Sequence, residues 1–379
     1  MGGLSIISMS SKLFSMEISK KRFMSPNQKD MLIKPTVTSS QDPAVYKRNS
    51  KDIILIVGVY VDDLIITGSN TNDVVEFKEQ MKKEFEMSDL GLLSYYLGIE
   101  VSQKKWGISL RQTTYAKKIL EQFGLLDCNP TTSPMEPKLK VKKDEDGEKV
   151  DPTEYRRVVG CLRYLTHTRP DLSFSVGITS RFMEEPAILH FQVVKHILRY
   201  VKGTVDYGIN YGRGHEIEDF VGFTDSDLGG DPVDSKRTSG MIFYLGRNVI
   251  TWQSQKKKNV ALSTCEAEFM AATTTACQSI WLANLVKELT RHHIMPITLY
   301  VDNKSAIALM KNPVFHGRSK DIDIRYHFIR ECVERGQIIM EYVNSKDQQA
   351  DIFTKALAYV KHSEMRNMIG VTNLEPSSV

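Results

Sequence analysis

The chain has 379 residues, of which 41% are hydrophobic and 25% are charged. This length allows two or three domains, and this composition is typical of a globular protein and excludes bulk disorder. Fifty Lys and Arg residues against 46 Asp and Glu residues leave a net charge of +4. That excess is too small to indicate a nucleic-acid partner by itself, so any basic binding surface must be local.

The five cysteines lie far apart in the sequence and form no CxxC pair. Neither a disulfide framework nor a zinc site is therefore favoured, and a reducing compartment is. No apolar run reaches the ~20 residues of a membrane span, and the N-terminus is unlike a signal peptide. We expect a protein that is not secreted, has no membrane partner and resides in the cytoplasm, with the nucleus as an additional location.

Residues 1–36 show no sustained hydrophobic period, and we expect this N-terminal segment to be weakly ordered. The first firm element is the apolar run from Ile53 to Val61, which is followed by Asp62, Asp63 and a second apolar run from Leu64 to Thr67. This pattern predicts a β-hairpin with the two aspartates at its tip. Neighbouring carboxylates inside an apolar run suggest a catalytic function, and a solvated hairpin tip is the alternative.

From residue 70 onward the spacing of Val74, Phe77, Met81 and Phe85 predicts a helix. The segments "YYLGIEVSQ" and "GISLRQ" predict paired strands, and "TTYAKKILEQFGL" predicts a second helix. Residues 128–152 then hold four prolines and a dense mixture of charges. We expect this stretch to be a linker between domains, or a long surface loop.

The pattern of residues 153–215 predicts a helical segment with a basic character. Its basic side chains are those of a solvated helix surface, or of a surface that binds a phosphate backbone. Residues 216–358 alternate strands with helices, which predicts an α/β (α+β) domain built on a mixed β-sheet with flanking helices. Residues 359–379 are expected to form a C-terminal tail.

Four acidic residues in the α/β domain adjoin strongly apolar elements. Asp225 follows the strand-like "DFVGFT", Glu268 lies in the first turns of a long helix, Asp302 follows "ITLYV", and Asp351 lies in a closing helix expected over "SKDQQADIFTKAL". If these carboxylates converge, they repel one another unless cations hold them. Oxygen ligands without His or Cys favour Mg²⁺ or Mn²⁺, and two such ions ~4 Å apart are suited to cutting a phosphodiester. The alternative is four unrelated caps or surface charges.

The start of the long helix distinguishes two of its acids. "STCE" from Ser263 to Glu266 fits a capping box, in which Ser263 is the N-cap residue and Glu266 reaches back to its backbone. Glu266 then has a structural role, and Glu268 is available for chemistry.

Several motifs follow one another in a specific order: "YVDDLIITGSN", "YYLGIEV", "RPDLSFSVG", "TCEAEF", "DNKSAIALMKNPVFHGRSK" and "QQADIFTKAL". In this order they resemble the Pol polyprotein of copia-type LTR retrotransposons, from roughly Asp42 to Leu357. The resemblance implies that residues 37–127 are the C-terminal part of a reverse transcriptase palm. It implies a thumb-like or connection-like helical segment at 153–215 and a ribonuclease H-like domain at 216–358.

By this resemblance the acidic set of the α/β domain is the metal-binding and catalytic set of a ribonuclease H: Asp225, Glu268, Asp302 and Asp351. An enzyme of this kind uses Mg²⁺ or Mn²⁺ to hydrolyse the RNA strand of an RNA–DNA hybrid. The chain departs from the family pattern at Asp321, where His is usual, and at Leu228, where Trp is usual. Neither position belongs to the four acids.

Asp62 and Asp63 match the YVDD motif of the family's polymerase site. That site needs a further aspartate from an earlier strand, and none of the earlier acids lies in an apolar strand like the family's first catalytic motif: Glu17, Asp30, Asp42 and Asp52. We therefore expect an incomplete, inactive RNA-directed DNA polymerase site, for which a separate Pol fragment would supply the fingers and the rest of the palm. The alternative for the whole chain is a catalytically inactive retrotransposon relic with at most weak nucleic-acid binding.

Overall fold

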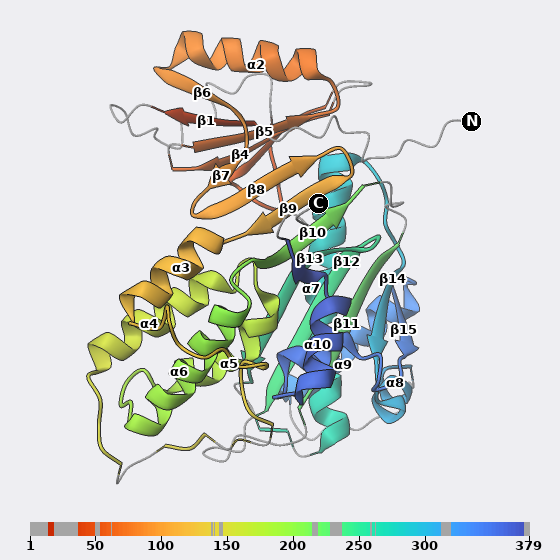
Figure 1. Ribbon diagram of the computed structural model, residues 1–379. Coiled ribbons are helices and arrows are strands. Elements are labelled where there is room, and N and C mark those ends of the chain that lie inside the picture. Colours follow the sequence, from red (N-terminus) through yellow and green to blue (C-terminus); the bar gives the residue numbers. More distant parts are fainter. Residues whose placement is uncertain are drawn as a thin grey trace.

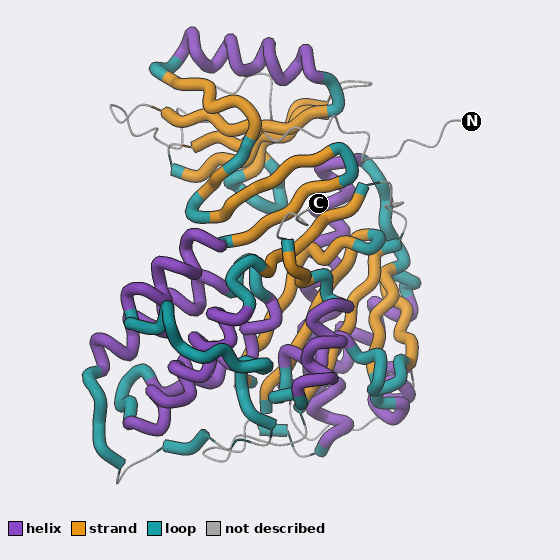
Figure 2. Tube along the Cα trace, viewed as in Figure 1, coloured by secondary structure: helices purple, strands orange, loops and turns teal. Residues whose placement is uncertain are grey.

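The computed structural model describes residues 14–18, 37–49, 54–61, 63–137, 139, 141–143, 147–213, 219–227, 237–257, 260–261, 263–311 and 320–374. Asp62, Leu228 and the side chain of Asp321 lie outside the described residues. Three β-sheets and a group of helices make up the described part of the chain, which confirms the mixed α/β class (Figure 1). Outside the helical group, runs of consecutive strands are separated by helices (Figure 2).

The first sheet has six strands in the order β2-β3-β4-β5-β1-β6. The strands are β1 (Phe14–Ile18), β2 (Val37–Thr38), β3 (Val45–Asn49), β4 (Ile54–Tyr60), β5 (Asp63–Gly68) and β6 (Met87–Leu92). Burial alternates along β4 and β5, so one face of this hairpin is apolar and packs against helix α2 (Thr71–Glu84). Asn70 caps that helix, because its side chain accepts a hydrogen bond from the backbone N–H of Asn72.

Residues 1–36, which were expected to be weakly ordered, contain one described strand, β1. Phe14–Ile18 pairs antiparallel with both β5 and β6, and so lies between them in the sheet. The sequence "FSMEI" is too short to show a hydrophobic period that would predict a strand. Its pairing comes from the two neighbouring strands, whose backbone groups need partners.

A second sheet joins segments that the sequence assigned to different units. Its order is β16-β10-β9-β8-β7. The strands are β7 (Tyr95–Tyr96), β8 (Ile99–Lys104), β9 (Gly107–Arg111), β10 (Tyr207–Gly212) and β16 (Val371–Asn373). Strand β10 pairs with β9 on one side and β16 on the other. The segments predicted as palm, helical segment and tail therefore share this sheet, and the boundaries at residues 127, 215 and 358 do not separate independent folding units.

The helical module follows the second sheet, and its helices share one core. Its elements are α3 (Thr113–Gln122), α4 (Pro152–Leu165), η2 (Pro170–Leu172), α5 (Ser173–Thr179), η3 (Ser180–Phe182) and α6 (Ile188–Gly203). A buried ion pair stabilises the module, with Arg169 Nη2 lying 2.7 Å from Asp171 Oδ2. The Tyr200 hydroxyl donates to the same carboxylate and accepts a hydrogen bond from Arg366 of helix α10 (Tyr359–Met368). The predicted C-terminal tail is thus part of the core.

The third sheet has the order β13-β12-β11-β14-β15. The strands are β11 (Phe220–Ser226), β12 (Thr238–Leu245), β13 (Asn248–Lys256), β14 (Ile297–Val301) and β15 (Ile338–Tyr342). Strand β12 is antiparallel to both β11 and β13, whereas β14 runs parallel to β11 and β15 runs parallel to β14. Helices α7 (Thr264–Thr290), α8 (Lys304–Lys311) and α9 (Lys320–Glu334) cover one face, as Figure 1 shows. The other face packs against η4 (Gln349–Phe353) and α10 (Tyr359–Met368).

The closing helix expected over "SKDQQADIFTKAL" is instead the short 3₁₀ turn η4. Tertiary hydrogen bonds explain this difference, because Gln348 Nε2 donates to the backbone oxygen of Thr224 in β11. Gln348 Oε1 also accepts from Ala350 N–H and so begins the turn. The Gln348 side chain therefore holds the start of the turn to the sheet, and Ser254 Oγ of β13 donates to the Phe353 oxygen at its end. In the described part of the chain, the helices lack the combination of length and apolarity that a membrane span requires.

Candidate metal centre

Two of the four predicted acids meet because they end adjacent parallel strands. In the pairing of β11 with β14, Phe223 lies opposite Tyr300. Two residues further along each strand, Asp225 and Asp302 are therefore level with each other and on the same face of the sheet. Asp225 is buried, whereas Asp302 is half-buried and accepts a hydrogen bond from the hydroxyl of Ser345.

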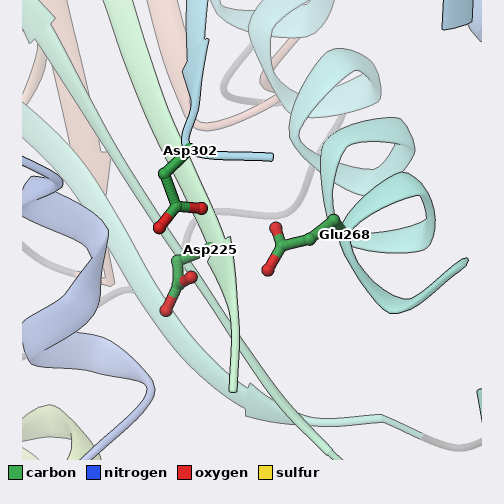
Figure 3. Close-up of side chains that lie close together, drawn as sticks. All are labelled: Asp225, Glu268 and Asp302. Carbon is green, nitrogen blue, oxygen red and sulfur yellow. The ribbon is translucent and has the colours of Figure 1, made fainter. Parts of the chain in front are cut away.

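Glu268 reaches the same place from helix α7, on the other face of the sheet. Ser263 caps this helix by accepting from Glu266 N–H, as predicted. The Ser226 N–H at the end of β11 donates to Glu268 Oε1 over 3.1 Å. Asp225, Glu268 and Asp302 each offer an oxygen within 4.8 Å of the others, and Figure 3 shows the three carboxylates pointing toward a common space. The structure therefore brings these three predicted acids together.

Asp351 lies beside this group, next to Asp225, rather than within it. Lys355 Nζ is 2.7 Å from Asp351 Oδ1 and 3.9 Å from Asp225 Oδ2, so one ammonium group bridges the two buried carboxylates. The Thr354 hydroxyl donates to Asp225 Oδ2. The fourth predicted acid therefore extends the cluster on its Asp225 side.

Burial and mutual repulsion set the pKa values of these groups. Burial raises the pKa of Glu268 to about 9, and the charges of Asp225 and Asp302 add to the effect. Burial, followed by the charge of Asp225, raises the pKa of Asp351 to about 7. Burial also raises the pKa of Asp225, although Lys355 and Thr354 oppose that shift. These carboxylates need a positive charge near them to be ionised together at neutral pH.

The oxygens of the cluster fit a divalent cation. Glu268 Oε2 is buried and has no hydrogen-bond partner among the described residues. A buried carboxylate oxygen without a partner is costly, because it loses its water and gains nothing in return. Carboxylate oxygens alone suit Mg²⁺ or Mn²⁺. Asp225, Glu268 and Asp302 could hold such an ion, whereas the Lys355 ammonium group lies between Asp225 and Asp351.

Sequence reasoning missed three residues that shape the cluster: Gly240, Thr354 and Lys355. Thr354 and Lys355 follow Asp351 by three and four residues. In a turn or helix those positions lie close to it, so "DIFTK" carried a usable signal. Gly240 gave no such signal. Its importance appears only because η4 packs directly against it in the third sheet.

The hairpin of the first sheet places Asp63 as the first residue of β5, opposite Tyr60. Asp62 lies outside the described residues, so its predicted pairing with Asp63 in one site stays a prediction. On the other side of β5, the residue of β1 that is level with Asp63 is Glu17. Sequence reasoning had set Glu17 aside because its surroundings do not resemble the family's first catalytic motif.

A mixed sheet of this order, with acids at the ends of its two central parallel strands, defines a ribonuclease H-like domain. The family of reverse transcriptases (RNA-dependent DNA polymerases) matches residues 29–137. The chain is 37% identical to the retrovirus-related Pol polyprotein from transposon RE1 of Arabidopsis thaliana, over 90% of this chain and 23% of that protein. It is also 37% identical to an uncharacterized mitochondrial protein of the same plant, over 59% of this chain and 92% of that protein.

The chain therefore belongs to the family of copia-type retrovirus-related Pol polyproteins, and it spans about a quarter of the length of the Pol polyproteins that it matches. The chain is also similar to a solved structure of a foamy viral protease-reverse transcriptase in complex with dsDNA. The match covers 88% of this chain and 68% of the foamy viral chain. The two are 13% identical, with a TM-score of 0.48.

Proposed function

We propose that this chain is a metal-dependent ribonuclease that hydrolyses the RNA strand of an RNA–DNA hybrid. The observation that carries the proposal is the convergence of Asp225, Glu268 and Asp302, with Glu268 Oε2 buried and unpartnered. A cluster that only stabilised the fold would contain partners for its own charges. This one has an excess of negative charge in a buried place, which suits divalent cations and the phosphate groups that such cations bind.

The chemistry of bound Mg²⁺ or Mn²⁺ in such a site would be activation of the attacking water and stabilisation of the leaving oxygen. The chain's own groups would hold and orient the ligands. Ser226 N–H fixes one oxygen of Glu268, which leaves the other directed into the cluster. Thr354 and Lys355 hold Asp225 and Asp351 in their positions. A hybrid would be distinguished from other duplexes by its shape and its 2′-hydroxyls.

The hairpin that carries Asp63 would not polymerise DNA in this chain alone. Polymerisation with two metal ions requires carboxylates from both sides of the site. A further aspartate from a separate Pol fragment, supplying the fingers and the rest of the palm, would be needed to complete it. Primer extension on a homopolymer template by the purified chain alone would overturn this part of the proposal.

The ribonuclease proposal is tested with the full chain, a hybrid labelled on its RNA strand, and Mg²⁺. We expect the wild type to cut the RNA strand and Asp302→Asn to reduce cutting by at least a hundredfold. Asp302 is half-buried and the substitution keeps its shape, so the variant should fold, as circular dichroism would verify. No cutting by folded wild-type chain in Mg²⁺ or Mn²⁺ would reject the enzyme and favour the inactive relic.

A further inference from the structure

The two sides of the carboxylate cluster differ in how their charge is compensated. On the Glu268 side, the buried oxygen Oε2 accepts no hydrogen bond from the described residues. The charge of Lys257 opposes the rise in the pKa of Glu268, but its ammonium group donates to the backbone oxygen of Ala267. On the other side, Asp351 Oδ1 is also buried and accepts no hydrogen bond from the residues that the structure describes, but Lys355 Nζ lies 2.7 Å from it. Within the described part of the chain, the Asp351 side therefore has an ion pair and the Glu268 side does not.

The backbone after η4 fixes Lys355 in this place. The N–H groups of Thr354 and Lys355 both donate to the backbone oxygen of Asp351, at 3.1 Å and 3.2 Å. This turn brings the side chain of Lys355, four residues further on, to the Asp351 carboxylate. The Thr354 hydroxyl donates to Asp225 Oδ2 and so holds the turn beside the second carboxylate. The ammonium group therefore also lies 3.9 Å from Asp225 Oδ2 and bridges the two acids.

A bridging ammonium group and a bridging divalent ion compete for the same space. Mg²⁺ binds carboxylate oxygens at about 2.1 Å, so an ion that joined Asp225 to Asp351 would lie among the oxygens next to Lys355. Two cations at so short a separation repel each other strongly in a buried place. The side chains of Asp225 and Asp351 are only 4% and 6% exposed, so little water can screen that repulsion. A second ion could therefore enter only if Lys355 left.

We propose that Lys355 takes the place of a second divalent ion, so that the folded chain binds a single Mg²⁺ or Mn²⁺ ion. The residues that would hold this ion are Asp225, Glu268 and Asp302. Lys355 is then a positioning residue, which sets the number of metal ions and holds Asp351 beside Asp225. This inference deepens the metal centre and rests on the proposed function for the use of the ion. Its test counts ions and does not depend on cleavage.

Titration of the full chain with Mn²⁺, followed by the electron paramagnetic resonance signal of the free ion, counts the bound ions. We expect the wild type to bind one ion per chain and Lys355→Met to bind two, because methionine keeps much of the side-chain volume and removes the charge. Lys355→Arg retains the charge and should bind one. Lys361→Met is the matched control and should also bind one, because Lys361 of α10 donates to the backbone oxygen of Lys346 instead.

Asp351→Asn locates the second ion, because its addition to Lys355→Met should return the count to one. Two ions on the wild type, or one ion on folded Lys355→Met, would overturn the inference. A wild type that binds one ion but leaves a labelled hybrid uncut rejects the proposed ribonuclease and leaves this inference standing. Circular dichroism verifies that each variant is folded. If Lys355→Met is not, Lys355→Gln, which is neutral and keeps a hydrogen-bond donor, replaces it with the same expected count.

Discussion

At the scale of single residues, Glu268 combines two features that conflict in the absence of a cation. One of its oxygens is held by Ser226 N–H, and the other is buried without a partner. Its pKa is raised from 4.5 to about 9 by burial and then by Asp225 and Asp302. The folded chain therefore holds a proton on Glu268 that the unfolded chain releases near pH 4.5.

The sign of this linkage gives a prediction for the metal-free protein. A group whose folded pKa is raised contributes stability that is complete below its unfolded pKa and is lost as pH rises through its folded pKa. In EDTA, the wild type should lose stability between pH 5 and 9, and Asp351, with a pKa raised to about 7, should add to the loss. Glu268→Gln should be more stable than the wild type by about 1–3 kcal/mol at pH 9, because glutamine stays neutral.

The measurement is thermal unfolding in EDTA and in Mg²⁺ across this pH range. Mg²⁺ should stabilise the wild type most at high pH, where the ligands ionise readily, and should have little effect on Glu268→Gln. Glu266→Gln, in the same turn of α7, serves as the control and should show no gain at pH 9. A wild type that is more stable than Glu268→Gln at pH 9 without metal would contradict this account.

At the scale of elements, the position of η4 depends on a residue that has no side chain. A Cβ at Gly240 would lie 2.7 Å from Phe353 Cβ and 2.8 Å from both the Ala350 oxygen and Thr354 Cγ2. These atoms belong to η4 and the residue after it, so the turn lies against the strand because Gly240 leaves room. The same turn carries Asp351 to Asp225.

Gly240→Ala should therefore move η4 away from the sheet. We expect a loss of about 1–3 kcal/mol from overpacking, weaker stabilisation by Mg²⁺ and at least a tenfold loss of cleavage. Gly160→Ala is the matched control, since a Cβ at this helical position of α4 has nothing within 4 Å. It should stabilise the chain by about 0.5–1 kcal/mol. Equal stability and equal response to Mg²⁺ in Gly240→Ala and the wild type would refute the role of Gly240.

These elements also show what the sequence could predict. The sequence predicts the apolar strands before Asp225 and Asp302 and the capped helix that carries Glu268. Each of these elements follows from the local pattern of its own residues. Their convergence was inferred from charge and from the family motifs. The 3₁₀ form of η4, the strand β1 and the pairing of β10 with β16 were not predictable, since each depends on partners distant in the sequence. Non-local pairing of this kind leaves no period in the segment itself.

At the scale of the whole molecule, one acidic residue joins the first sheet to helix α7. Glu288 accepts hydrogen bonds from Ser40 N–H at 3.0 Å and from Ser40 Oγ at 2.8 Å, and it forms a 3.0 Å ion pair with Lys47 of β3. An open surface pocket of about 630 Å³ adjoins this contact. Glu288 lies 20 residues after Glu268 along α7, which is about 30 Å, so the pocket is remote from the carboxylate cluster.

This contact links the polymerase-like sheet to the ribonuclease H-like domain, and its charge state gives the last prediction. Burial alone would raise the pKa of Glu288, but the hydrogen bonds from Ser40 and Lys47 outweigh burial and hold the pKa at about 2. A depressed pKa contributes stability that is present above the unfolded value of 4.5 and is lost as pH falls toward 2. The contact between the first sheet and helix α7 should therefore be stable at neutral pH and weaken in acid.

At pH 7, Glu288→Gln should reproduce the effect that protonation of Glu288 has in acid. We expect a loss of about 1–2 kcal/mol and faster amide hydrogen exchange in β3, while Mg²⁺ still stabilises the carboxylate cluster, because α7 itself is unchanged. Glu331→Gln removes an exposed ion pair between Glu331 of α9 and Arg335, the residue after the helix, and should alter stability by less than about 0.5 kcal/mol. If exchange in β3 is the same in both variants, then Glu288 does not join the two parts, and their arrangement depends instead on the second sheet, in which β10 pairs with β9 and β16.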